Sequence, residues 1–350
     1  MAEKDRITKR KRDHLRLVLL PSSQVGDAGF PSYRFIHNAL PEIDFDDIRL
    51  NTQFLGKKVN FPFFISCMTG GLKEGKNINI NLAKAAQKFN IPMGVGSQRL
   101  AIENHDLEDL FKVRKFAPDV PLMANIGLVQ LNYGYGLNEF QKCVDMVGAD
   151  ALVVHINPIQ EIIQPEGDRN WKGLLGKLEK IVSKLSVPVI AKEVGFGLSE
   201  SVVKRLYKVG VRIFDTAGWG GTNWAMVEGL RGKADRELAA IFSQWGISTT
   251  ESIKNCRKFN KLLNAKHHSP ITILGSGGVR NGSDIAKSLA LGADLAGIAT
   301  PFAKAALSSN EVVEKLIEKY ALELKVAMFA VGAKDINELK NTKLVRNSLC

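Results

Sequence analysis

The sequence lacks paired cysteines and long apolar runs. Its four cysteines, Cys67, Cys143, Cys256 and Cys350, lie far apart with no CxxC pair. This spacing argues against a zinc site and a disulfide framework, and it is typical of a protein from a reducing cytoplasm. No stretch reaches the roughly 18 consecutive apolar residues of a transmembrane helix, and the N-terminus lacks the apolar core of a secretory signal. We therefore expect a cytoplasmic protein with no membrane segment.

Acidic residues are outnumbered, and the formal net charge is +12. Seven basic residues fall within the first sixteen, namely Lys4, Arg6, Lys9, Arg10, Lys11, Arg12 and Arg16. Such an arm binds nucleic acid, clamps a polyanionic small molecule or is simply a solvated tail. The remaining basic residues are scattered among acids, and aromatic residues make up only 7% of the chain with no stacking pattern. Nucleic-acid binding is therefore not expected.

Eight short apolar runs follow one another after residue 60. They cover residues 61–71, 91–99, 120–127, 151–157, 187–195, 211–218, 271–278 and 295–301. Segments with helical spacing separate them, and this alternation indicates a parallel sheet. Eight such units fit a closed (β/α)8 TIM barrel better than a doubly wound sheet, which normally stops at about six strands.

The spacing of the runs also predicts the organisation of the chain. We expect residues 1–60 to form a basic N-terminal arm and extension, residues 61–335 the barrel, and residues 336–350 a C-terminal tail. The connection between the sixth and seventh runs is unusually long. A long insertion at this point of a compact barrel is usually functional, and often forms a lid over the site.

In barrels of this kind the active site lies at the C-terminal ends of the strands. Polar or small residues stand at these ends, at Thr69, Ser97, Arg99, Asn125, His155, Asn157, Lys192 and Thr216. In the fourth run, alternation places Val153, His155 and Asn157 on one face of the strand. Because buried polar groups need partners, His155 and Asn157 together indicate a polar site in the barrel mouth.

Two further charged residues follow strand ends. Glu161 comes after Pro158, on what we expect to be a loop above the barrel, and one carboxylate combined with substrate phosphates is the usual protein site for Mg²⁺. An exposed loop glutamate is the alternative of equal weight. Lys192 ends the fifth run among apolar residues, so it must be paired or perturbed. Schiff-base formation, base catalysis and stabilisation of a developing anion all remain open to it.

The seventh run ends in GSGG, with Gly275, Gly277 and Gly278. The loops after the seventh and eighth strands form the usual phosphate site of a TIM barrel. The loop lacks GxGxxG spacing and lies in the seventh unit, which argues against a dinucleotide site. It indicates instead the phosphate of a mononucleotide or sugar phosphate, with Gly221 and Thr222 as further donors.

Seven motifs occur in a fixed order along the chain. They are RKRDH, MTGG, GVGSQR, HINPIQE, AKEVGFG, AGWGGT and GSGGVRNGSDIAKSLALGAD. Together they resemble the type 2 isopentenyl-diphosphate isomerases, FMN-dependent (β/α)8 enzymes, over about residues 9–335. HxNxxQE is the most diagnostic of the seven.

The resemblance implies interconversion of isopentenyl diphosphate and dimethylallyl diphosphate by a 1,3 proton shift, a step in the biosynthesis of isoprenoid precursors. It implies reduced FMN as acid and base, Mg²⁺ to hold the diphosphate, NAD(P)H as reductant of the flavin, and a homo-oligomer, either tetramer or octamer. A rival FMN barrel, the 2-hydroxy acid oxidase, needs a catalytic histidine near an arginine. Only His155 stands at a strand end, and it belongs to HxNxxQE.

The same resemblance assigns residues to roles. The FMN contacts are Met68, Thr69, Gly70, Ser97, Asn125, Lys192, Thr222, Gly278, Val279, Arg280, Ala299 and Thr300. The substrate contacts are Arg10, Lys11, His14, Ser97, Gln98, Arg99 and Gln160, while Gln160, His155 and Asn157 are catalytic and Glu161 binds Mg²⁺. Cys67 and Trp219 stand where smaller residues are commoner, and both are expected near the flavin.

Overall fold

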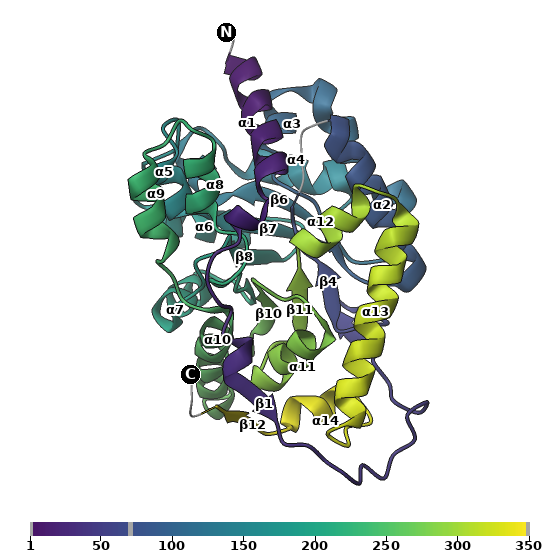
Figure 1. Cartoon of the computed structure of the whole chain (residues 1–350). Helices are drawn as coiled ribbons and strands as arrows, with labels where there is room; N and C mark the ends of the chain where they lie inside the picture. The colour runs from purple at the N-terminus through teal and green to yellow at the C-terminus, as the bar shows by residue number, and fades with distance from the viewer. Residues whose placement is uncertain (1–2, 69–72, 348–350) are drawn as a thin grey trace.

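A closed barrel of eight parallel strands forms the centre of the molecule (Figure 1). The computed structural model describes residues 3–68 and 73–347. The barrel strands are β4 (Phe63–Ile65), β5 (Met93–Gly94), β6 (Leu122–Gly127), β7 (Ala151–Ile156), β8 (Val189–Glu193), β9 (Ile213–Asp215), β10 (Thr272–Ser276) and β11 (Leu295–Ile298). They pair in chain order, and β11 closes the ring on β4. Each apolar run contains one strand, so the predicted TIM barrel is confirmed.

Helices surround the barrel. The outer helices are α2 (Lys73–Phe89), α4 (Leu137–Val147), α6 (Leu174–Val182), α7 (Glu200–Lys208), α10 (Thr249–Ala265), α11 (Gly282–Leu291) and α13 (Asn310–Phe329). Short helices at the strand ends are α3 (Arg99–Glu103), α5 (Pro158–Ile163) and α12 (Thr300–Ala306). The predicted insertion between the sixth and seventh barrel strands adds α8 (Trp224–Leu230) and α9 (Arg236–Ser243) ahead of α10.

The N-terminal extension meets both ends of the barrel. Helix α1 (Glu3–Leu17) lies over the carboxyl ends of the strands (Figure 1). At the opposite end, β2 (Thr52–Phe54) and β3 (Lys57–Val59) form a hairpin. Strand β1 (Tyr33–Phe35) pairs antiparallel with β12 (Leu344–Arg346), which follows α14 (Ile336–Asn341). The segment expected as a tail is therefore folded back onto the extension as far as the structure describes it.

The strands divide the core into two layers, because successive side chains along a strand point to opposite faces. Val154 and its outward-facing counterparts pack against the surrounding helices, whereas Val153 faces the barrel interior. The interior cluster comprises Phe54, Phe64, Met123, Ala151, Val153, Ile190, Ile213, Leu274 and Leu295. Toward the carboxyl ends, the inward positions become polar at Ser66, Asn125, His155, Lys192, Asp215 and Ser276. The barrel interior is thus apolar toward the amino ends of the strands and polar toward their carboxyl ends.

Within the described part of the chain, we find no helix with the length and apolar character needed to cross a membrane.

Phe54 closes the amino end of the barrel and is only 4% exposed. Phe54→Ala is expected to lower the free energy of unfolding by about 3–5 kcal/mol, because it removes an aromatic ring and leaves a cavity under the interior cluster. Chemical denaturation measures the loss. Gln53→Ala, on the exposed face of the same strand, is the control and should change stability by less than about 0.5 kcal/mol. Equal effects of the two substitutions would show that the hairpin does not close the core.

Candidate functional site

A large cavity opens at the carboxyl ends of the barrel strands, beneath α1. Predicted site residues that line it are Arg10, Lys11, His14, Met68, Ser97, Arg99, Asn125, His155, Asn157, Gln160, Glu161, Lys192, Thr222, Gly278, Val279, Arg280, Ala299 and Thr300. Two other predicted flavin contacts, Thr69 and Gly70, lie outside the described residues. Segments far apart in sequence therefore meet in one place.

Gln98 is the exception among the predicted substrate contacts. Its side chain is fully buried, and Nε2 donates to the carbonyl of Cys143 at 2.9 Å. Its Oε1 accepts from the backbone N–H of Asn125 at 2.8 Å. The side chain thus connects β6 to α4 by hydrogen bonds, and it is not part of the cavity lining. The strand end turns this side chain outward while Ser97 lines the cavity, and a substrate contact at Gln98 stays a prediction.

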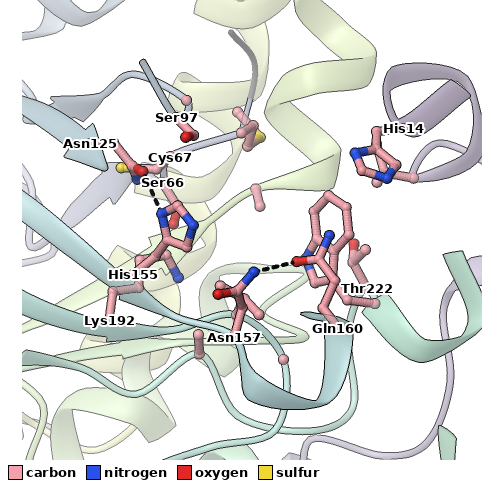
Figure 2. A pocket seen from close by; sticks show the side chains of 18 of the residues that line it. His14, Ser66, Cys67, Ser97, Asn125, His155, Asn157, Gln160, Lys192 and Thr222 are labelled. Atoms are coloured by element: carbon pink, nitrogen blue, oxygen red, sulfur yellow. Dashed lines mark hydrogen bonds between the residues drawn. The ribbon is translucent and has the colours of Figure 1, made fainter. Parts of the chain in front are cut away.

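The HINPIQE motif forms a short helix and not the expected loop. Pro158 occupies the first turn of α5, where its missing N–H costs nothing. Asn157 Nδ2 donates to Gln160 Oε1 at 3.0 Å and to Glu161 Oε1 at 2.9 Å. Figure 2 shows Asn157 and Gln160 side by side at the cavity wall. The helix therefore gives these three side chains one fixed arrangement.

His155 is a neutral hydrogen-bonding group. Its Nδ1 lies 2.9 Å from the amide oxygen of Asn125 (Figure 2), so Nδ1 carries the proton and Nε2 is left as an acceptor. Burial, followed by the charges of Lys11 and Lys192, lowers the pKa of His155 to about 3. The ring thus stays uncharged near neutral pH.

Lys192 supplies positive charge at the floor of the cavity. Its Nζ lies 3.3 Å from Asp215 Oδ2 and donates to the carbonyl of Glu193 at 3.0 Å. Asp215 in turn accepts a hydrogen bond from the hydroxyl of Ser276. An ion-paired ammonium is a poor nucleophile and a poor base, so this arrangement favours anion stabilisation among the roles left open by the sequence.

Two glycine loops pack against each other beside this floor. Gly277 and Gly278 have φ of +105° and +68°, and a Cβ on either would lie 2.3 Å from a carbonyl oxygen of the 218–220 loop. Close by, Thr222 Oγ1 and Thr300 Oγ1 are 2.9 Å apart. Ala299, at the start of α12, provides no side-chain cap. Backbone N–H groups of this first turn are thus available to an anion.

Three cationic side chains converge at the mouth. Arg10 and Lys11 come from α1, and Arg99 comes from the start of α3. Burial, reinforced by the charges of Arg10 and Arg99, lowers the pKa of Lys11 to about 7. The mouth is therefore arranged for a ligand that carries several negative charges.

Sequence reasoning missed Glu228, a fully buried carboxylate on α8. Its Oε1 accepts from His14 Nε2 at 2.8 Å and from Gln160 Nε2 at 3.0 Å, and its other oxygen pairs with Arg231. Burial raises the pKa of Glu228, but the hydrogen bond from His14 and the charges of His14 and Arg231 outweigh it and hold the pKa at about 2. The only signal in the sequence is an acid three positions before a basic residue within the insertion.

The two unusual residues expected near the flavin are separated by the structure. Cys67 lines the cavity, and burial raises the pKa of its thiol to about 11. Trp219 does not belong to the lining, since its ring packs on Gly26 and its Nε1 donates to the carbonyl of Ser243 at 2.7 Å. The expectation for Trp219 is therefore corrected.

The model of the FMN-dependent dehydrogenase family matches residues 23–120 and 164–346. The chain therefore belongs to this family of flavin-binding barrels. Curated relatives define the branch: isopentenyl-diphosphate delta-isomerases from Nostoc sp. and Rickettsia bellii are 48% and 45% identical to it over 337 and 344 residues. These matches cover 95% and 97% of this chain, and 94% and 98% of the relatives. Within the family, the chain is a member of the FMN-dependent isopentenyl-diphosphate delta-isomerases.

Solved structures with the same fold are more distant in sequence. A mutant of flavocytochrome b2 with pyruvate bound has a TM-score of 0.68 at 18% identity, over 97% of this chain and 82% of that one. A mandelate oxidase mutant with an FMN adduct has a TM-score of 0.63 at 15% identity, over 99% of this chain and 100% of that one. These likenesses support the barrel fold and carry no argument about substrate.

The lowered pKa of Lys11 predicts proton uptake on binding of a polyanion. Above about pH 7 the free lysine is largely neutral, whereas a bound anion stabilises its charged form, so at about pH 8 inorganic diphosphate should bind with uptake of a proton. Affinity should fall as the pH rises through this range. Calorimetry in two buffers with different ionisation enthalpies measures the uptake.

Lys11→Arg is the matched control, because arginine remains charged throughout this range and should abolish the uptake. A binding enthalpy that does not depend on the buffer in the unmodified protein would contradict this assignment.

Proposed function

We propose that this protein interconverts isopentenyl diphosphate and dimethylallyl diphosphate by a 1,3 proton shift, with FMN, Mg²⁺ and the diphosphate bound in the cavity under α1. The names of its relatives support this substrate pair. The observation that carries the proposal is the meeting of Asn157, Gln160 and Glu161 with the cationic mouth above Lys192. Production of isoprenoid precursors is the corresponding role.

The lining fits FMN. The two glycine loops leave no room for a Cβ, and they lie beside Thr222, Thr300 and the uncapped start of α12. These groups and Arg280 would hold the flavin phosphate, and Lys192 would supply positive charge to the flavin. FMN in its reduced form would supply an electron-rich ring and an acid/base nitrogen. NAD(P)H is the proposed reductant.

The donor set also fits a lightly held Mg²⁺. Each Glu161 oxygen accepts one hydrogen bond, from Asn157 Nδ2 or from the backbone of Asp168, and so retains a free lone pair. No group of three metal-ligating side chains occurs in the described part of the chain, so the diphosphate would provide further ligands. In the same described part, the buried amide oxygens of Gln130 and Asn157 have no partner. Both residues line the cavity and offer acceptors to bound water.

The protein side chains then have distinct tasks. Arg10, Lys11 and Arg99 would bind the diphosphate through charge-assisted hydrogen bonds, and α1 would exclude water above it. Lys192 would hold negative charge at the floor. Gln160 has no useful pKa, so it would orient the alkene or relay a proton, with its amide fixed by the buried Glu228. His155, neutral and bonded to Asn125, would donate no proton of its own near neutral pH.

Oxidation of a 2-hydroxy acid is disfavoured by the same histidine. That reaction needs a basic imidazole to remove an α-proton. The pKa of His155 is lowered to about 3, and its Nδ1 partner is an amide and not a carboxylate. A homo-oligomer, tetramer or octamer, stays a prediction, as does a cytoplasmic location.

The proposed function predicts turnover only with reduced flavin. Under anaerobic conditions, the protein with dithionite-reduced FMN and Mg²⁺ should convert isopentenyl diphosphate to dimethylallyl diphosphate and incorporate deuterium from D₂O. The same mixture with oxidised FMN under air is the control and should be inactive. Product formation in the oxidised mixture, or absence of product in the reduced one, would refute the proposal.

Glu161→Gln is expected to raise the Mg²⁺ concentration for half-maximal rate about tenfold or more, because a neutral amide replaces the proposed ligand. Rates measured across a magnesium titration give this value. Glu166→Gln is the matched control, since Glu166 pairs with Arg231 outside the cavity lining and should leave the titration unchanged. An unchanged titration in Glu161→Gln would remove Glu161 as the ligand.

A further inference from the structure

Asp168, on the segment that follows α5, contacts two cavity residues of opposite charge. Its Oδ2 accepts from Arg99 Nη1 at 2.6 Å, and its backbone N–H donates to Glu161 Oε2 at 2.8 Å. Asp168 is 8% exposed and is not part of the cavity lining. One residue behind the wall is therefore bonded both to a cation of the mouth and to the proposed magnesium ligand.

The surroundings of Asp168 hold it in one position. Gln130 Nε2 donates to the same carboxylate oxygen at 2.9 Å, and Trp171 Nε1 donates to the carbonyl of Asp168 at 3.0 Å. At the preceding position, a Cβ on Gly167 would lie 1.8 Å from the carbonyl oxygen of Glu161. Only glycine allows the chain to approach α5 this closely. This close approach brings the backbone N–H of Asp168 within hydrogen-bond distance of the Glu161 carboxylate.

Arg99 has a second carboxylate partner that provides a comparison. Its Nε donates to Glu103 at 2.8 Å, one turn along α3. The Glu103 side chain is 33% exposed and that of Asp168 11%. Exposed pairs are screened by water and contribute little, whereas charges removed from water interact more strongly. The geometry of Arg99 toward the cavity therefore depends mainly on Asp168.

Arg99 needs carboxylate partners because other cationic side chains lie near it. Arg99 shares the mouth with Arg10 and Lys11, and unpaired cations repel one another at this range. Burial lowers the pKa of Arg99, but the hydrogen bond that Arg99 donates to Glu103 and the charge of Asp168 outweigh it and raise the pKa overall. Glu103 and Asp168 thus both compensate the like charges around the Arg99 guanidinium, and Asp168 is the more buried of the two.

We propose that Asp168 is a positioning residue of the diphosphate site: its carboxylate fixes Arg99 while its peptide N–H fixes Glu161. Asp168 thereby fixes the distance between Arg99, which would bind the diphosphate, and Glu161, which would bind Mg²⁺. This inference rests on the proposed function. Because Asp168 touches neither alkene nor flavin, its effect falls on binding of the magnesium diphosphate and not on proton transfer.

The experiment compares Asp168→Asn with Glu103→Gln. Each replaces one carboxylate partner of Arg99 by an amide, and Asp168→Asn also keeps the peptide N–H to Glu161. Asp168→Asn should raise the KM for isopentenyl diphosphate about tenfold or more while kcat changes less than about threefold. Glu103→Gln should leave KM within about twofold. Equal KM values for the two variants, or a loss confined to kcat, would overturn the proposal.

A double-mutant cycle separates positioning from a general loss of structure. If Asp168 acts through Arg99, then Asp168→Asn should change KM by less than about twofold in an Arg99→Gln background. Additive effects would contradict that route. FMN affinity, followed by flavin fluorescence, should stay within about twofold in Asp168→Asn, since no flavin contact is altered.

Separate controls distinguish misfolding of the variant from failure of the proposed function. If Asp168→Asn does not fold, Asp168→Glu keeps the charge but shifts it by one methylene, and an unchanged KM there would equally overturn the proposal. If the unmodified protein shows no isomerase activity, the proposed function fails. Calorimetric affinities for magnesium diphosphate then still test Asp168, and equal affinities for the unmodified protein and Asp168→Asn would reject its role.

Discussion

The buried carboxylate of Glu228 links three parts of the chain that are far apart in sequence. It accepts hydrogen bonds from His14 of the arm and Gln160 of the HINPIQE helix, and it pairs with Arg231 of its own helix. A buried charge is tolerated only when it is paired and hydrogen-bonded. The arm, the motif helix and the insertion must therefore come together for the Glu228 carboxylate to be buried with its partners.

The cavity offers two kinds of anion recognition at its two ends. Beside the floor, glycine loops and the start of α12 present backbone groups that cannot change charge. At the mouth, Arg10, Lys11 and Arg99 present side chains whose charge depends on burial and on one another. Backbone cradles suit a resident group held permanently, whereas side chains on a helix of the extension suit a ligand that enters and leaves.

The barrel and most of its site could be predicted from sequence. Each of the eight apolar runs contains a strand, and alternation predicts that Val153 and His155 share one face, which the structure shows to be the interior face. Periodicity reports which side of a strand is buried, so it located the residues near the mouth. It does not report where a chain turns after the strand, which is why it predicts neither the burial of the Gln98 side chain between β6 and α4 nor the helix α5.

The partners of the site residues could not be predicted in this way. Glu228 and Asp168 lie in connections, where no period constrains their neighbours, and each acquires its role only when other segments fold against it. Trp219 follows a strand end like the true lining residues, yet its ring packs on Gly26 of the extension. Long-range packing decided these positions, and a local pattern carries no information about it.

The pairing of β1 with β12 has a consequence for how the chain is made. Tyr33 and its neighbours leave the ribosome before the barrel, but their partners around Arg346 follow only after the whole barrel has been synthesised. The barrel has the same property, since β4 must wait for β11. Two strand edges thus remain unpaired until these later segments have been synthesised, a period in which such edges are open to association with other chains. The barrel can close once β11 has been synthesised, whereas β1 gains its partner only when β12 follows.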